Sequence, residues 1–272
     1  MASSTKTKRG RHFRLTPLAV GVGLALGIGQ LRVVTAADNP GDPVGAEFQV
    51  NNTATNGQVT PAVAVDADGD FVVVWQGDGE IGKDSFGAPI IVTGIFARCY
   101  SNTGLPVSTE FPIDSSSTAE TPGVAMDADG DFVVAWEDVE LTDVYFRRYS
   151  QRCEARDSER QQANATTNGR TPSVAMDADG DFVVAWGGYE TPSDYYSNIY
   201  ARRYNNLGDA QDVSEFRINT SFPVSGGPSI AMDADGDFVV AWESYYNDIF
   251  ARRYNNLGQD LDNPEFQVND PE

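Results

Sequence analysis

The sequence predicts an all-β protein built from repeated units of four antiparallel strands. The string DADGDFVV occurs four times, with first aspartates at positions 66, 127, 177 and 233, which are 61, 50 and 56 residues apart. The surrounding segments are rich in β-branched and aromatic residues, which favour strands, and turn residues recur about every ten positions, which disfavours helices. A period near 50 over most of the chain indicates one repeat architecture and not several unrelated domains.

Each unit begins with a predicted hairpin. The four copies read TPAVAVDADGDFVVVW, TPGVAMDADGDFVVAW, TPSVAMDADGDFVVAW and GPSIAMDADGDFVVAW. In each copy, two apolar runs flank an Asp-Gly turn, which is a strong hairpin signal. The second run is apolar at every position, so both of its faces should be buried. A strand buried on both faces needs a packed sheet on each side, as the blade of a β-propeller has.

The third and fourth strands are predicted from a second pair of motifs. GIFARCY, DVYFRRY, NIYARRY and DIFARRY follow a variable stretch, and TEFPID, SEFRIN and PEFQVN come after a turn such as SNTG or NNLG. The second unit departs from this pattern, because SQRCEARDSERQQANAT replaces its turn and final strand. A further copy of the final strand, AEFQVN at 46–51, precedes the first unit and could complete or cover the last one.

We therefore expect a small, four-bladed β-propeller over residues 38–272. A partial propeller that closes by dimerisation and a twisted solenoid of sheets are the structural alternatives. The sequence leaves the closure of four blades open.

These motifs resemble the β-propeller-type repeats of large secreted bacterial proteins. The string EFQVN…PSVAMDADGDFVVAW…IYARRYNNLG carries the resemblance, which covers nearly the whole chain after residue 37 and is strongest in the third and fourth units. The resemblance implies an extracellular or surface-associated fold, often found beside calcium-binding or adhesive modules. It implies no particular activity.

Residues 1–37 have the composition of a secretory signal peptide. Five basic residues and no acidic residue precede the apolar, glycine-rich segment LTPLAVGVGLALGIGQL, and small residues follow at Ala36 and Ala37. A run of about 17 apolar residues diluted by glycines is marginal for a retained membrane anchor, which is the alternative. We expect cleavage, a mature chain that starts near Asp38, export to the medium or the cell surface, and no membrane insertion afterwards.

The charge of the mature chain excludes several classes of function. Removal of residues 1–37 takes away six basic residues and no acidic ones, which changes the net charge from −21 to −27. Binding to nucleic acid is not expected, because it needs clustered lysines and arginines. The only histidine, His12, lies in the signal peptide, so Ser-His-Asp and Cys-His mechanisms are excluded. The paired arginines of FRRY and ARRY are expected to bind neighbouring carboxylates or to pack between sheets.

The repeated aspartates are predicted to bind calcium, with a plain hairpin turn as the alternative. Their spacing is that of the first three ligands of a calcium loop. The motif is not an EF-hand, since its glycine is at the fourth position and no glutamate stands at the twelfth. Asp-Gly is itself a favoured turn, and duplication copies a turn with the rest of the unit. The candidate ligands are Asp66, Asp68, Asp70, Asp127, Asp129, Asp131, Asp177, Asp179, Asp181, Asp233, Asp235 and Asp237.

Variable loops between the second and third strands are expected at the opposite end of the sheets from the Asp turns. Such loops on a rigid scaffold often carry binding. GGYETPSDYYSN and ESYYND hold tyrosines beside carboxylates, which could stack on sugar rings and hydrogen-bond their hydroxyl groups. The alternative is that these tyrosines only cover sheet edges. The candidate ligand-binding residues are Tyr189, Tyr195, Tyr196, Tyr245 and Tyr246.

Cys99 and Cys153 are the two cysteines of the chain. An exported protein permits one disulfide between them, but the sequence cannot show that the two sulfur atoms meet. Two separate free thiols are the alternative.

A non-catalytic module for binding or adhesion to an extracellular glycan or protein is the function that these observations favour, with calcium as a stabilising ion. Two alternatives stay open. One is a structural extracellular repeat protein without a ligand, and the other is a glycoside hydrolase, whose two carboxylates need no histidine. No acidic residue stands out from the repeats as a unique catalytic group, which disfavours the hydrolase.

Overall fold

A computed structural model describes residues 45–53, 57–189, 191, 197–221 and 223–269. These residues form sixteen strands and no helix, so they contain no helix that could cross a membrane. The chain divides into two units, Met1–Phe48 and Gln49–Glu272, and every strand belongs to the second unit. The predicted signal peptide, residues 1–37, lies outside the described residues.

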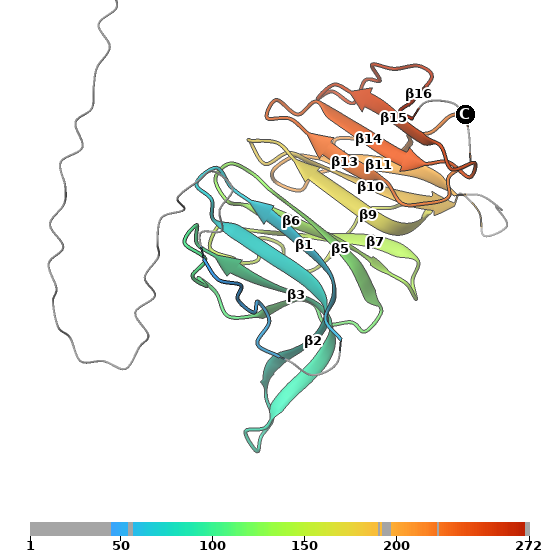
Figure 1. Cartoon of the computed structure of the whole chain (residues 1–272). Helices are drawn as coiled ribbons and strands as arrows, with labels where there is room; N and C mark the ends of the chain where they lie inside the picture. The colour runs from blue at the N-terminus through green and yellow to red at the C-terminus, as the bar shows by residue number, and fades with distance from the viewer. Residues whose placement is uncertain (1–44, 54–56, 190, 192–196, 222, 270–272) are drawn as a thin grey trace, which may run out of the picture. The chain divides into compact units, whose positions relative to one another are not determined.

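The strands form four antiparallel sheets, each of four strands in chain order (Figure 1). The first sheet contains β1 (Val59–Val65), β2 (Phe71–Lys83), β3 (Pro89–Tyr100) and β4 (Phe111–Asp114). The second contains β5 (Ala119–Met126), β6 (Phe132–Asp138), β7 (Asp143–Tyr149) and β8 (Gln161–Gln162). The third contains β9 (Asn168–Met176), β10 (Phe182–Tyr189), β11 (Asn198–Tyr204) and β12 (Phe216–Arg217). The fourth contains β13 (Ser229–Met232), β14 (Phe238–Glu243), β15 (Ile249–Tyr254) and β16 (Phe266–Gln267). The predicted repeat of four-stranded units is confirmed, and it includes the divergent second unit.

Consecutive sheets pack face to face around three apolar cores. As predicted, β6 is buried at all seven positions, because each of its faces contacts a neighbouring sheet. In the core between the third and fourth sheets, Val183 and Ala185 of β10 pack with Phe238, Val240 and Trp242 of β14. The equivalent positions fill the cores between the first and second sheets and between the second and third. In the second and third sheets, one face of the second strand therefore packs against the next sheet and the other face against the preceding one.

The innermost strands meet at a common place. The Thr-Pro or Gly-Pro pair that begins each unit lines one hollow of about 320 Å³. Thr60, Thr121 and Thr171 have left-handed φ angles of 48°, 50° and 45°. Gly227 takes this place in the fourth unit, where a Cβ atom would lie 2.5 Å from Oγ1 of Thr171. Convergence of the first strands of all four sheets is the arrangement of propeller blades.

The two cysteines form a disulfide, which the sequence left open. Cys99 lies on β3 of the first sheet and Cys153 in the turn after β7 of the second, with their Cα atoms 6.6 Å apart. The bond therefore links two neighbouring sheets. It closes a loop with a sequence separation of 54.

A glutamate before most outer strands binds the segment that follows the preceding outer strand. Glu215 accepts hydrogen bonds from the backbone N–H groups of Thr166 and Thr167, at 2.7 and 2.9 Å. Glu265 accepts one from Ser221 at 2.7 Å, and Glu110 accepts one from Asn52 at 2.8 Å. We call Glu110, Glu215 and Glu265 the outer-strand glutamates. Glu215 and Glu265 tie neighbouring sheets together at their outer edges, and Glu110 ties the leading segment to the first sheet.

The second sheet has an arginine at the position of the outer-strand glutamate. Arg160 donates to Oδ2 of Asp114, at 2.9 Å, and to Oδ2 of Asp138, at 3.1 Å. The divergent second unit thus keeps the connection between sheets by a charge-assisted pair of the opposite polarity.

Residues 49–51 of the leading copy of the final strand, which belong to the second unit, pack on the first sheet and not on the last. The backbone oxygen of Val50 accepts hydrogen bonds from Nη1 of Arg98, at 2.9 Å, and from the hydroxyl of Tyr100, at 3.1 Å. The equivalent Arg252 of the fourth sheet donates to the backbone oxygen of Ile218, in the outer strand region of the third. Residues 49–53 therefore stand where the outer strand of a preceding sheet would lie, and the fourth sheet is completed by its own β16. This corrects the expectation that the leading copy completes the last unit.

Candidate functional site

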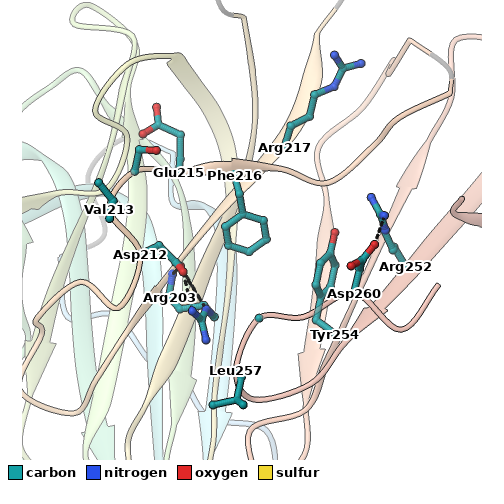
Figure 2. A pocket seen from close by; sticks show the side chains of 12 residues that line it. Arg203, Asp212, Val213, Glu215, Phe216, Arg217, Arg252, Tyr254, Leu257 and Asp260 are labelled. Carbon is teal, nitrogen blue, oxygen red and sulfur yellow. Dashed lines mark hydrogen bonds and ion pairs between the residues drawn. The ribbon is translucent and has the colours of Figure 1, made fainter. Parts of the chain in front are cut away.

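A groove of about 460 Å³ lies between the outer parts of the third and fourth sheets (Figure 2). One wall is formed by β12 and residues 212–215 before it. The other wall is formed by β15 and the turn at 257–260 after it. We call this space the outer groove.

Two aromatic rings form the apolar part of the outer groove. Phe216 on β12 is placed there by its pairing with Ala201 of β11. Its ring centroid lies 5.7 Å from that of Tyr254, with an interplanar angle of 60°. Tyr254 is buried, and burial raises the pKa of its hydroxyl to about 12. Its hydroxyl therefore stays protonated at neutral pH and can donate a hydrogen bond.

Two fixed ion pairs flank these rings, as Figure 2 shows by its dashed lines. Nη2 of Arg203 lies 2.6 Å from Oδ1 of Asp212, and Nη2 of Arg252 lies 2.6 Å from Oδ2 of Asp260. Arg252 also donates to the backbone oxygens of Ile218, at 2.9 Å, and of Asp262, at 2.8 Å. The predicted pairing of the repeated arginines with neighbouring carboxylates is thus confirmed in the described residues, where Arg148 and Arg253 form the same kind of pair with Asp157 and Asp262.

Glu215, the buried acidic residue of the outer groove, has a structural role. Burial alone would raise the pKa of Glu215, but hydrogen bonds from the backbone and hydroxyl groups of Thr166 and Thr167 outweigh it, so the pKa is lower than the ordinary value. Glu215 therefore stays ionised at neutral pH, with its oxygens bound to the preceding sheet. It is not available to donate a proton to a ligand.

The groups of the outer groove that remain accessible to a ligand are both polar and apolar. The guanidinium of Arg217 is exposed at the rim, and the carboxylate of Asp260 remains 42% exposed beside its arginine. Together with the ring of Phe216, they offer hydrogen-bond donors, an acceptor and an apolar surface. The groove is lined by three arginines and three acidic residues, so its formal charges balance.

The corresponding place between the second and third sheets lacks two of these features. Gln161 pairs with Phe146 there as Phe216 pairs with Ala201, and Ala210 stands in the repeat where the fourth unit has Asp260. Phe216, Arg217, Tyr254 and Asp260 were not among the residues predicted from the sequence. Arg217 and Asp260 differ from their counterparts in the other units, and this difference is the signal that could have found them; Phe216 and Tyr254 belong to the shared motifs.

The Asp turns are hairpin turns held by their own carboxylates. Oδ1 of Asp66 accepts hydrogen bonds from the backbone N–H groups of Asp68 and Asp70, both at 2.9 Å. Oδ1 of Asp70 accepts a third, from the N–H of Asn102 at 2.7 Å. The glycine of the turn, Gly69, has a φ angle of 89°. The first aspartate has the same role in all four turns, and so has the third.

These hydrogen bonds limit what the turns can offer to an ion. The described residues contain no group of three or more His, Cys, Asp or Glu side chains arranged to hold a metal. The carboxylates of Asp68, Asp129, Asp179 and Asp235 are exposed, whereas one oxygen of the first and third aspartates is already used. Burial raises the pKa values of Asp127 and Asp177. Calcium binding at these turns stays a prediction.

The candidate tyrosines do not line the outer groove. Tyr245 and Tyr246, between β14 and β15, are 50% and 63% exposed, and their rings meet edge to face at 5.8 Å. Tyr189 ends β10 and is half-buried. Tyr195 and Tyr196 lie outside the described residues. Ligand binding by these tyrosines also stays a prediction.

Comparisons with known proteins give a likeness of fold. No family model matches the sequence, and a search of curated proteins finds no match. A solved structure of a protein of unknown function from Dyadobacter fermentans DSM 18053 is similar, with 12% identity, a TM-score of 0.50, and coverage of 80% of this chain and 71% of that chain. The fucose-specific lectin from Aleuria aurantia shares 9% identity with a TM-score of 0.45, over 76% of this chain and 60% of the lectin.

The GH93 α-L-arabinofuranosidase of Fusarium graminearum shares 11% identity with a TM-score of 0.47, over 79% of this chain and 82% of that enzyme. At such identities the likeness concerns the fold alone. The sheet topology shows a propeller-type all-β repeat fold, and the similar structure from Dyadobacter fermentans agrees with it in fold.

Proposed function

We propose that this chain is a non-catalytic, glycan-binding module of the propeller-repeat type, and that the outer groove holds the sugar. The observation that carries the proposal is the ring of Phe216 beside fixed polar groups. Ligand sites combine apolar surface with a few oriented polar groups. An aromatic ring covers the apolar face of a sugar, while charged groups that are held in place hydrogen-bond its hydroxyls.

The charge of the groove supports an uncharged ligand. Arg203 and Arg252 are each bound to a carboxylate, so they do not present unpaired positive charge to an anion. The chain as a whole carries a formal charge of −21, which repels polyanions. A purely apolar ligand would leave the ion pairs without solvent, which is costly. A neutral oligosaccharide matches both conditions.

The acidic residues of the outer groove support binding without catalysis. Glycoside hydrolysis needs one carboxyl group with a raised pKa as the acid and a second carboxylate as base or nucleophile. Glu215 has a lowered pKa, because backbone amides hold its oxygens. Asp212 is bound by Arg203 through both side-chain and backbone N–H groups.

A hydrolase remains the second candidate because of a different groove. A space of about 250 Å³ between the second and third sheets is lined by Asp127, Asp129 and Asp131. Burial raises the pKa of Asp127, and two other carboxylates stand beside it. Release of product from a panel of chromogenic glycosides, lost in Asp127→Asn, would replace the binding proposal by this one.

The proposed place of action is outside the cytoplasm, with calcium at the Asp turns as an added stabilising ion. The basic and apolar leader supports export. Expression of the full chain in a bacterial host, followed by mass spectrometry of the exported protein, should give an N-terminus near Asp38. Full-length protein retained in the cytoplasm would contradict export.

Glycan-array screening of the mature chain, followed by titration of the best glycan, tests the function. Phe216→Leu keeps an apolar side chain but removes the ring, and we expect affinity to fall about two- to tenfold, since an aromatic contact is worth about 0.5–1.5 kcal/mol. Gln161→Leu, at the equivalent place on the second sheet, is the matched control and should bind normally. Absence of binding to every glycan by the folded chain would favour a structural protein without a ligand.

A further inference from the structure

Two sheet faces in the described part of the chain lack the neighbour that covers the same face elsewhere. On the fourth sheet, Ile249 is 37% exposed, whereas the equivalent Ile199 of the third sheet is fully buried by the fourth. On the first sheet, Val63 and Val65 are 65% and 60% exposed. The equivalent Val174 of the third sheet is buried in the core that it shares with the second. We call these surfaces the open face of the fourth sheet and the open face of the first sheet.

The two open faces carry the two complementary halves of the apolar contact that joins consecutive sheets. Between the third and fourth sheets, the Val and Ala positions of FVVAW in one sheet meet the Phe, Val and Trp positions of the next. The open face of the fourth sheet shows the Val and Ala positions, Val239 and Ala241, which are only half-buried. The open face of the first sheet shows the Phe and Val positions, Phe71 and Val73, which are also half-buried. These are the two halves of the core that occurs three times within the chain.

A polar connection between sheets repeats in the same way. Nη1 of Arg148 donates to the backbone oxygen of Asn206 in the next sheet, at 2.8 Å. Nη1 of Arg203 donates to that of Asn256 in the next sheet, at 3.0 Å. Arg253 is the fourth-sheet copy of these arginines, and it is held by Asp262 with its side chain 58% exposed. The asparagine that would complete the series is Asn102 of the first sheet.

A second polar contact follows the same order. The carboxylate of Glu137 in the second sheet accepts the backbone N–H of Thr171 in the third. The fourth-sheet copy of Glu137 is Glu243, which is exposed on the open face. The first-sheet copy of Thr171 is Thr60, whose left-handed φ angle of 48° matches that of 45° at Thr171. Apolar surface, guanidinium and carboxylate on the fourth sheet thus all have counterparts on the first.

We propose that the open face of the fourth sheet binds the open face of the first sheet of a second copy of this chain, head to tail. The contact continues the packing of the three interfaces within the chain. Such a heterologous contact closes into a ring or extends into a filament. Two copies would close a ring of eight sheets, which lies within the range of about four to eight blades seen in propellers.

The proposal includes an exchange of two identical segments. The place beside Arg98 that the last strand of the second copy would occupy is filled by residues 49–53 of the same chain. The leading segment and the last strand both read EFQVN. The last strand of the second copy can therefore take the place of residues 47–51, which have the same sequence.

An engineered disulfide tests the orientation of the contact. Cys99 and Cys153 already join the first sheet to the second, and their equivalents across the proposed contact are Arg253 and Gly104. Cys153 has a φ angle of 62° and Gly104 one of 75°, so a cysteine can adopt the backbone conformation required at 104. The double variant Arg253→Cys with Gly104→Cys should form a disulfide between chains under mild oxidation. Each single variant is a matched control and should remain uncrosslinked.

Peptide mapping of the oxidised protein separates the outcomes. A 104–253 bond between two chains, seen as a covalent dimer or longer species without reductant, is the expected result. A 104–253 bond within one chain would overturn the proposal and show that four sheets close by themselves. Bonds of 253 to 253 or of 104 to 104, or reactive thiols without any crosslink in a folded protein, would overturn it as well.

The native mature chain gives a second, independent measurement. Sedimentation should show at least twice the mass of one chain, and Arg253→Glu should sediment as a monomer at the same concentration. Arg152→Glu makes the same change of charge at an exposed site of the second sheet and should leave the mass unchanged. A native chain that is monomeric at every concentration, or an Arg152 variant that dissociates equally, would overturn the proposal.

Discussion

The second and third sheets, which we call the inner sheets, lie between other sheets, whereas the first and fourth are the end sheets of the series. The four sheets have nearly the same motifs, but equivalent residues are buried to different extents. Val183 in the third sheet is 2% exposed, whereas the equivalent Val239 in the fourth is half-buried. The sequence around each reads DADGDFVVAW. The difference therefore comes from the neighbour and not from the residue. Each sheet therefore buries both of its faces only when a neighbouring sheet packs on each of them.

Truncation of an isoleucine in the third sheet and of its equivalent in the fourth should give the largest difference in stability. Ile199→Ala removes a fully buried side chain and should lower the free energy of unfolding by about 2–5 kcal/mol. Ile249→Ala acts at the equivalent, partly exposed position and should cost clearly less. Urea unfolding of dilute protein measures both. Equal losses would show that the open face of the fourth sheet is covered in solution even at low concentration.

Removal of the disulfide tests how much it stabilises the interface between the first and second sheets. Replacement of Cys99 and Cys153 by serine should lower the free energy of unfolding by about 2–4 kcal/mol, because the bond restricts the unfolded chain. Arg148→Ala, which breaks the polar connection at the same place of the next interface, is the comparison. We expect it to cost less than the loss of the disulfide. The reverse order in thermal unfolding would mean that the arginine connection dominates.

The contribution of the outer-strand glutamates to the free energy of unfolding should depend on pH. The pKa of Glu215 is lower in the folded chain than its ordinary value of 4.5, so its contribution is fully present above that pH and is lost as the pH falls towards the folded pKa. Glu215→Gln should cost about 1.5–3 kcal/mol at neutral pH, since charged hydrogen bonds are lost, and should flatten the loss of stability below pH 4.5. Glu110→Gln, in the half-buried first-sheet copy, should have a smaller effect. An unchanged pH profile in Glu215→Gln would contradict this role.

Calcium should have the smallest effect. The first and third aspartates of each turn already accept backbone hydrogen bonds, so an ion would gain chiefly the exposed second aspartate. We expect calcium to raise the unfolding midpoint of the mature chain by about 2–4 °C, which corresponds to about 1 kcal/mol. Asp129→Asn with Asp179→Asn should reduce that rise. An equal effect of magnesium at the same ionic strength would identify screening of repelling carboxylates instead.

Much of the fold was predictable because local patterns determine it. The all-apolar FVVAW motif indicated a central strand with two buried faces, and β6 and β10 confirm this. The Asp-Gly pairs indicated hairpins, which the turn at 66–70 confirms. The uncovered face at Val239 was not predictable, since the same letters are buried in the inner sheets.

The candidate site was less accessible from sequence for two reasons. Aspartates that bind calcium and aspartates that accept amide hydrogen bonds in a turn obey the same spacing, so the pattern alone cannot separate them. The outer groove depends on Asp260, which stands where the third unit has Ala210, and on Phe216, which belongs to the shared EF motif that the second unit lacks at Gln161. A shared residue such as Phe216 does not show by itself which copy of the motif lines a groove.

The outer-strand glutamates also determine where this chain can be divided for study. Glu215 belongs to the third sheet, yet its partners at Thr166 and Thr167 precede the first strand of that sheet. A fragment cut at the sheet boundary, at residue 168, would leave this carboxylate without its amides. A fragment that begins at Ala163 would keep them. A fragment that contains the third sheet should therefore begin with the segment 163–167, which follows the outer strand of the second sheet.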